Sequence, residues 1–175
     1  MGADPRVTPR DGLGRIDPSG LVKGWALDRA GGMLRDAAIR NFAVNAGGDV
    51  IVAGHREPGE PWRVGVQHPE VRNAVACVVA VTDVGVATSG RYERGDHIVD
   101  PRTGRPATAL TAVTVIGPCL AVADGRATGI LALGDDAGRW MGEHPDIPVL
   151  TIADDETVTT TPAFDDHRTT AVDDR

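Results

Sequence analysis

The chain has 175 residues, of which 41% are apolar, and its 18 basic and 25 acidic side chains give a formal net charge of −7. This length predicts one domain, or part of a larger protein. The negative charge excludes a general nucleic-acid surface, because phosphate contacts require an excess of cations.

The first half of the chain predicts a leader, a helix and several strands. Residues 1–15 are rich in Gly, Pro and Arg, and we expect a flexible leader. Apolar residues recur at helical spacing over residues 20–35, with Ser19 as the expected N-cap. Strands are predicted over residues 41–45, 49–53, 62–67, 75–82 and 83–87. The run 75–82 is continuously apolar, so we expect this strand to be buried on both faces.

The second half begins with a polar loop, residues 88–104, which contains hydroxyls, carboxylates, arginines and a histidine. A strand over 110–116, helices over 121–133 and 135–142, and a hairpin of 149–152 with 157–160 follow. The polar tail, residues 161–175, is expected to be disordered. Strands with helices at irregular intervals predict an α+β fold with a mostly antiparallel sheet and two to three packed helices.

Asp124 and Thr128 are four residues apart in the predicted helix 121–133, which places both side chains on one face. A carboxylate and a hydroxyl near a helix N-terminus suit Mg²⁺, which takes few protein ligands and completes its shell with water and phosphate oxygens. The same spacing also fits a purely structural role, so the residues alone leave both interpretations open.

Three further segments carry candidate site residues. Asn45, Gly47 and Gly48 form either a tight hairpin turn or a close approach to a phosphate. Lys23, near a helix start, is either a phosphate ligand or a solvated side chain. His97 lies between Asp96 and Asp100 in the polar loop, and is either a proton acceptor or an ordinary surface histidine.

Six segments taken together resemble the ApbE-type FAD:protein FMN transferases, in the order typical of that family. They are Asp17-Pro-Ser-Gly-Leu-Val-Lys23-Gly-Trp-Ala-Leu-Asp28-Arg29, Val44-Asn-Ala-Gly-Gly-Asp49, Trp62-Arg-Val-Gly-Val-Gln-His-Pro69, Thr88-Ser-Gly-Arg-Tyr92, His97-Ile-Val-Asp-Pro-Arg-Thr-Gly104 and Ala123-Asp124-Gly-Arg-Ala-Thr128. The resemblance implies an ApbE-like flavin transferase domain over residues 16–160.

Members of this family cleave FAD with Mg²⁺ and transfer its FMN portion to a Thr or Ser hydroxyl of an acceptor flavoprotein, releasing AMP. The resemblance implies that Asp124, Thr128 and the Gly20 carbonyl bind the metal and that His97 assists catalysis. It implies FAD contacts from a larger group: Lys23, Asp28, Asn45, Gly47, Gly48, Ser89, Gly90 and Thr103. The acceptor is expected to carry an Asp-x-x-Ser/Thr-Gly-Ala-Ser/Thr segment.

Family members usually carry a substantial region before the Lys23 motif, so we expect a naturally shortened form, a fragment of a longer gene product or half of an assembly. Missing core strands would expose an apolar face or a sheet edge, which a second copy or another chain would cover. Two alternatives to the transferase therefore stay open: a non-catalytic FAD-binding module, and a pyrophosphatase that forms FMN and AMP with water as acceptor.

No run of about 18 apolar residues occurs, so no transmembrane helix is predicted. The first ten residues contain no apolar stretch of the kind found in secretory signals, and we expect a cytoplasmic protein.

Overall fold

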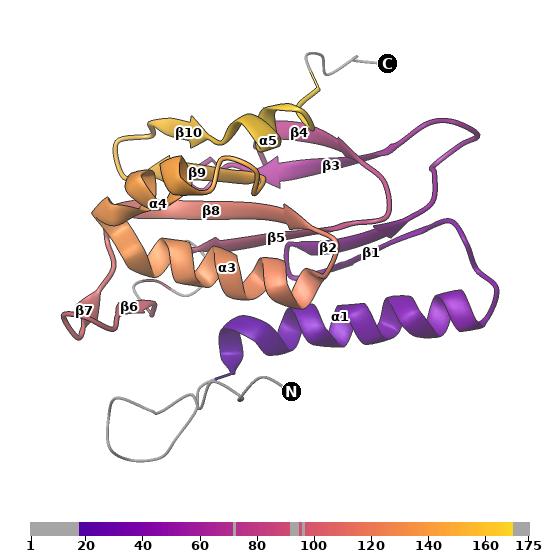
Figure 1. Ribbon diagram of the computed structural model, residues 1–175, viewed down its shortest axis with the longest axis horizontal. Helices are drawn as coiled ribbons and strands as arrows, with labels where there is room; N and C mark the ends of the chain where they lie inside the picture. Colours follow the sequence, from indigo (N-terminus) through magenta and orange to yellow (C-terminus); the bar gives the residue numbers. More distant parts are fainter. Residues whose placement is uncertain (1–17, 72, 92–94, 96, 170–175) are drawn as a thin grey trace.

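The computed structural model describes residues 18–71, 73–91, 95 and 97–169, and it is built around one antiparallel sheet (Figure 1). The six strands lie in the order β1-β2-β5-β8-β9-β10. Their bounds are β1 Phe42–Ala46, β2 Asp49–Ala53, β5 Gly85–Gly90, β8 Leu110–Gly117, β9 Val149–Ala153 and β10 Val158–Thr160. Each neighbouring pair is antiparallel, and the hairpin of β9 with β10 confirms the prediction for this segment.

Two helices, α1 (Ser19–Asp36) and α3 (Leu120–Leu133), lie side by side on one face of this sheet (Figure 1). Their contact is close because Gly24 of α1 faces the backbone of α3. A Cβ atom at Gly24 would lie 2.6 Å from the Leu120 carbonyl oxygen, so a larger residue cannot be accommodated without a shift. The core on this side includes Leu27, Leu120 and Leu131.

The N-terminus of α1 differs from the prediction by one residue. Ser19 is the first helical residue, and Pro18 precedes it in the N-cap position. The Pro18 carbonyl accepts hydrogen bonds from the amides of Leu21 and Val22, which is the geometry of a first helical turn. Proline has no amide hydrogen and a fixed φ angle, so it costs little at a helix start.

The opposite face of the sheet is covered by the hairpin of β3 (Trp62–Gln67) with β4 (Val75–Val81) and by α5 (Pro162–Asp165). The prediction that residues 75–82 form a strand buried on both faces is wrong. Among the strands, β4 pairs with β3 in a separate two-stranded sheet, and Val75 is 53% exposed whereas Val79 is fully buried. Because the hairpin covers the sheet as an outer layer, one of its faces remains open to solvent.

The expected disordered tail is also wrong for residues 161–169. Phe164 of α5 is fully buried in the core, and the Thr169 amide donates to the Val78 carbonyl. The buried Phe164 ring, the hydrogen-bonded Thr161 side chain and backbone hydrogen bonds to β4 together hold this segment. Residues 170–175 and the expected leader, residues 1–15, lie outside the described residues.

The polar loop is shorter than expected, because β5 extends to Gly90 and residues 99–106 form a small hairpin. Its strands are β6 (Val99–Asp100) and β7 (Arg105–Pro106). After α3, the short helices η1 (Gly134–Asp136) and α4 (Ala137–Glu143) lead into β9. The α+β fold with an antiparallel sheet and packed helices is confirmed. None of the helices in the described part of the chain is long and apolar enough to span a bilayer.

Candidate functional site

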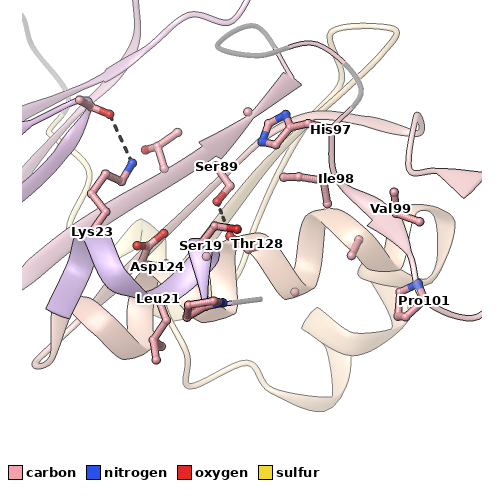
Figure 2. A pocket seen from close by; sticks show the side chains of 18 residues that line it. Ser19, Leu21, Lys23, Ser89, His97, Ile98, Val99, Pro101, Asp124 and Thr128 are labelled. Atoms are coloured by element: carbon pink, nitrogen blue, oxygen red, sulfur yellow. Dashed lines mark hydrogen bonds between the residues drawn. The ribbon is translucent and has the colours of Figure 1, made fainter. Parts of the chain in front are cut away.

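A cavity of about 800 Å³ lies where the start of α1, the end of β5, the middle of α3 and the segment before β6 meet (Figure 2). It brings together eight of the predicted site residues: Gly20, Lys23, Gly47, Ser89, Gly90, His97, Asp124 and Thr128. These residues come from segments more than 100 positions apart in the sequence. Their convergence is therefore a property of the fold and not of local sequence.

Asp124 and Thr128 point from α3 into this cavity, as their spacing predicts. The Asp124 carboxylate is only 3% exposed, and its Oδ2 accepts a hydrogen bond of 3.0 Å from the Gly24 amide of α1. The Thr128 hydroxyl lies 3.0 Å from the Ser89 hydroxyl. Asp124 is in the second turn of α3 and not at its N-terminus, so the helix end that faces the cavity is that of α1.

Gly20 of α1 lies against Thr128 and Gly125 of α3. A Cβ atom at Gly20 would lie 2.9 Å from Thr128 Oγ1, and the Gly20 oxygen is 3.7 Å from the position of a Cβ at Gly125. In a regular helix Gly20 O would accept from the Gly24 amide, but that amide also donates to Asp124. A carbonyl oxygen has two lone pairs, so the Gly20 carbonyl keeps acceptor capacity.

These oxygen atoms suit a hard divalent cation. A carboxylate, a hydroxyl and a backbone carbonyl are ligands that Mg²⁺ accepts, and Mg²⁺ completes its octahedral shell with water and phosphate oxygens. The residues present therefore fit Mg²⁺.

Lys23 lines the cavity, and its ammonium is paired with a buried carboxylate that was not predicted from the sequence. Asp49, the first residue of β2, is fully buried, and its Oδ1 accepts a hydrogen bond of 3.1 Å from the Thr88 amide. Its Oδ2 lies 3.3 Å from Lys23 Nζ and accepts no hydrogen bond from the described residues. Lys23 Nζ also donates to the Gly47 carbonyl at 3.4 Å.

Burial raises the pKa of Asp49 from 3.8 to about 6, although the Lys23 ammonium and the Thr88 amide act in the opposite direction. The nearby Asp124 carboxylate raises this pKa further. Two acidic groups, Asp49 and Asp124, therefore lie close to one ammonium, that of Lys23. The signal for Asp49 was visible in the sequence as a charged residue directly before a fully apolar strand segment.

His97 lies at the mouth of the cavity, with an exposed side chain. Its Nδ1 is 2.9 Å from the Gly95 carbonyl oxygen, which can only accept, so Nδ1 carries a proton in this arrangement. In the neutral ring Nε2 then holds the lone pair that a general base needs. Of the two expected carboxylate neighbours, Asp96 lies outside the described residues, and Asp100 is hydrogen-bonded to Arg102.

Four predicted FAD contacts do not line the cavity. Asp28 accepts hydrogen bonds from the amides of Leu120 and Ala121 and from the Cys119 thiol, so it caps the start of α3. Asn45 accepts from the Gly48 amide and thereby holds the β1–β2 turn, where Gly47 and Gly48 both have positive φ. Thr103 accepts from the Arg105 amide and lines a second, smaller cavity. In this structure, Asp28, Asn45 and Thr103 accept hydrogen bonds from nearby backbone amides.

Comparisons with known proteins identify the family to which this chain belongs. The family model described as "ApbE family" matches residues 5–151. The FAD:protein FMN transferase of Vibrio cholerae is 35% identical over 147 residues, which cover 78% of this chain and 44% of the relative. The relative of the same name from Rhodobacter capsulatus is 35% identical over 157 residues, or 85% of this chain and 30% of its own length.

Two solved structures share the fold. The ApbE protein of Thermotoga maritima superposes with a TM-score of 0.82 at 30% identity, covering 89% of this chain and 54% of the other. The flavin transferase ApbE of Vibrio cholerae gives a TM-score of 0.74 at 32% identity, covering 87% and 52%. The chain thus spans about half the length of these structures and less than half of the curated relatives. On the family model and these identities, the chain belongs to the ApbE family.

Proposed function

We propose that this protein transfers the FMN portion of FAD to a Thr or Ser hydroxyl of an acceptor flavoprotein, with Mg²⁺ as cofactor and AMP as the leaving product. The observation that carries the proposal is the cavity itself. It combines oxygen donors for a hard cation, an ammonium, a helix N-terminus and an exposed imidazole around one cavity. This set matches the charge and the chemistry of a diphosphate ester.

In the proposed site Asp124, Thr128 and the Gly20 carbonyl hold Mg²⁺. Bound there, the ion neutralises phosphate charge and stabilises the negative charge that builds up on the transferred phosphoryl group. Lys23 and the first turn of α1 add positive potential on the same side of the cavity. Such fixed positive groups favour the diphosphate bridge of FAD over uncharged flavins.

His97 is the proposed general base. Its Nε2 takes the proton of the acceptor hydroxyl while that oxygen forms a bond to the phosphorus of the FMN half. The bond between this phosphorus and the bridging oxygen breaks, and AMP leaves with the electron pair. The exposed position of His97 suits this role, because the hydroxyl arrives on a second protein.

One alternative is favoured by the same exposure. If water takes the place of the acceptor hydroxyl, the identical site hydrolyses FAD to FMN and AMP. This alternative predicts free FMN in the absence of any acceptor, whereas the transferase predicts little turnover under that condition.

The experiment is in-gel fluorescence of an acceptor domain that carries an Asp-x-x-Ser/Thr-Gly-Ala-Ser/Thr segment, after incubation with FAD and Mg²⁺. We expect a covalent flavin band that requires Mg²⁺ and is lost in Asp124→Ala. His97→Ala is expected to slow the reaction while FAD affinity stays nearly unchanged. Equal labelling by wild type and Asp124→Ala would refute the metal assignment, and no labelling by the wild type would refute the transferase.

A further inference from the structure

The Arg102 guanidinium joins the short β6–β7 hairpin, which follows His97, to the end of α3. Arg102 donates from Nε to Asp100 Oδ1 at 2.9 Å and from Nη2 to Asp100 Oδ2 at 3.1 Å, which is a two-point contact within the hairpin. The same Nη2 donates to the Leu133 carbonyl at 2.9 Å, and Nη1 donates to the Asp136 carboxylate. We call Asp100, Arg102, Asp136 and the Leu133 carbonyl the Arg102 network.

This network joins two parts of the site that are distant in sequence. On one side, the Ala107 amide donates to the Ile98 carbonyl, so the hairpin is closed directly after His97. On the other side, Leu133 is the last residue of α3, the helix that carries Asp124 and Thr128. Val99 and Pro101 of the hairpin line the cavity together with Ala132 of α3. The relative position of hairpin and helix therefore sets the distance from His97 to the oxygen donors.

The Arg102 guanidinium lies between two carboxylates. Hydrogen bonds from the Arg102 side chain lower the pKa of Asp100, and those to Asp100 and then Asp136 raise the pKa of Arg102. Asp100 and Arg102 therefore remain ionised over the pH range in which an enzyme is assayed. A guanidinium can make the two-point contact and still reach two other acceptors, whereas a lysine ammonium cannot reproduce this planar geometry.

We propose that Arg102 is a positioning residue, which holds the hairpin against the end of α3 and thereby fixes His97 relative to the metal-binding side chains. This inference rests on the proposed function. Arg102 lines the second, smaller cavity together with Asp100 and Asp136, so it acts through the hairpin and not by contact with FAD. Because small misplacements of a catalytic group lower the rate strongly, the effect should appear in kcat.

The test compares Arg102→Gln with Arg139→Gln in the full chain. Arg139 is a matched control because its guanidinium also approaches Asp136, at 4.0 Å. Within the described residues Arg139 forms no ion pair or hydrogen bond with the hairpin. We expect Arg102→Gln to lower kcat for flavin transfer about 10- to 100-fold, with KM for FAD nearly unchanged. Arg102→Lys should recover only part of the loss, and Arg139→Gln should stay within about twofold of wild type.

Two further readouts separate positioning from a general loss of structure. In the His97→Ala background, Arg102→Gln should lower kcat little further, because Arg102 acts by positioning the imidazole that this background already lacks. Hydrogen exchange at the Ala107 amide should be faster in Arg102→Gln than in Arg139→Gln. Equal exchange in the two variants, or a full additional loss in the His97→Ala background, would overturn the proposal. Absence of flavin transfer by the wild type would instead refute the proposed function, and the exchange comparison would still decide whether the network holds the hairpin.

Discussion

The buried carboxylate of Asp49 provides a quantitative test of the site's electrostatics. Burial raises its pKa from 3.8 to about 6, so the folded protein binds this proton more tightly than the unfolded chain does. Between about pH 4 and pH 6 the folded state holds more protons, and the free energy of unfolding therefore falls as the pH rises. The contribution of Asp49 to stability is most favourable below this window and is lost above it.

The substitution Asp49→Asn removes the charge and leaves an amide oxygen that can accept from Thr88. A shift from 3.8 to about 6 corresponds to about 2 to 3 kcal/mol between pH 4 and pH 7.5. We expect the stability of Asp49→Asn relative to wild type to increase by that amount over this interval. The assay is urea-induced unfolding of both proteins at the two pH values, in the absence of divalent cations.

The comparison is internally controlled, because any packing cost of the amide is the same at both pH values. A stability difference that does not change with pH would show that Asp49 ionises as an ordinary surface carboxylate. The electrostatic description of the wall formed with Lys23 would then be refuted.

Two other predictions concern packing. Gly24→Ala should destabilise the protein by about 1 to 3 kcal/mol, because the added Cβ would press on the α3 backbone. In the same helix, a Cβ at Gly32 meets no atom within 4 Å, so Gly32→Ala should stabilise the protein by about 0.5 to 1 kcal/mol. Equal stability of the two variants in thermal unfolding would contradict the contact between α1 and α3. Phe164→Ala should cost about 3 to 5 kcal/mol, since this fully buried ring fixes the end of the chain. Trp25→Ala, at a 56% exposed position, should change stability by less than about 0.5 kcal/mol, and similar urea midpoints for these two variants would show that residues 161–169 do not belong to the core.

Local patterns were sufficient to predict the helices other than α5, most strand positions and the placement of Asp124 and Thr128 on one helix face. The spacing of Asp124 and Thr128 depends only on the helical repeat, and the β9–β10 hairpin depends on two β-branched runs separated by turn residues. The family resemblance then indicated that Lys23, Ser89 and His97 belong to the same site, which no local pattern could show.

What the sequence could not predict depends on contacts between distant segments. Asp28 is 92 positions from the amide of Leu120 that it caps, so its motif position alone favoured a ligand role. The pKa of Asp49 is raised because folding buries its carboxylate. The strand 75–81 has an open face because the β3–β4 hairpin forms an outer layer on the six-stranded sheet. The polar composition of residues 161–169 concealed the burial of Phe164.

The central claim is that Asp124, Thr128 and the Gly20 carbonyl bind Mg²⁺ against the diphosphate of FAD. The most direct measurement is titration calorimetry of FAD binding with and without Mg²⁺, in wild type and in Asp124→Asn, which keeps an acceptor oxygen but removes the charge. We expect Mg²⁺ to tighten FAD binding to the wild type and to have no effect on the variant. Equal enhancement in both proteins, or none in the wild type, would contradict the claim.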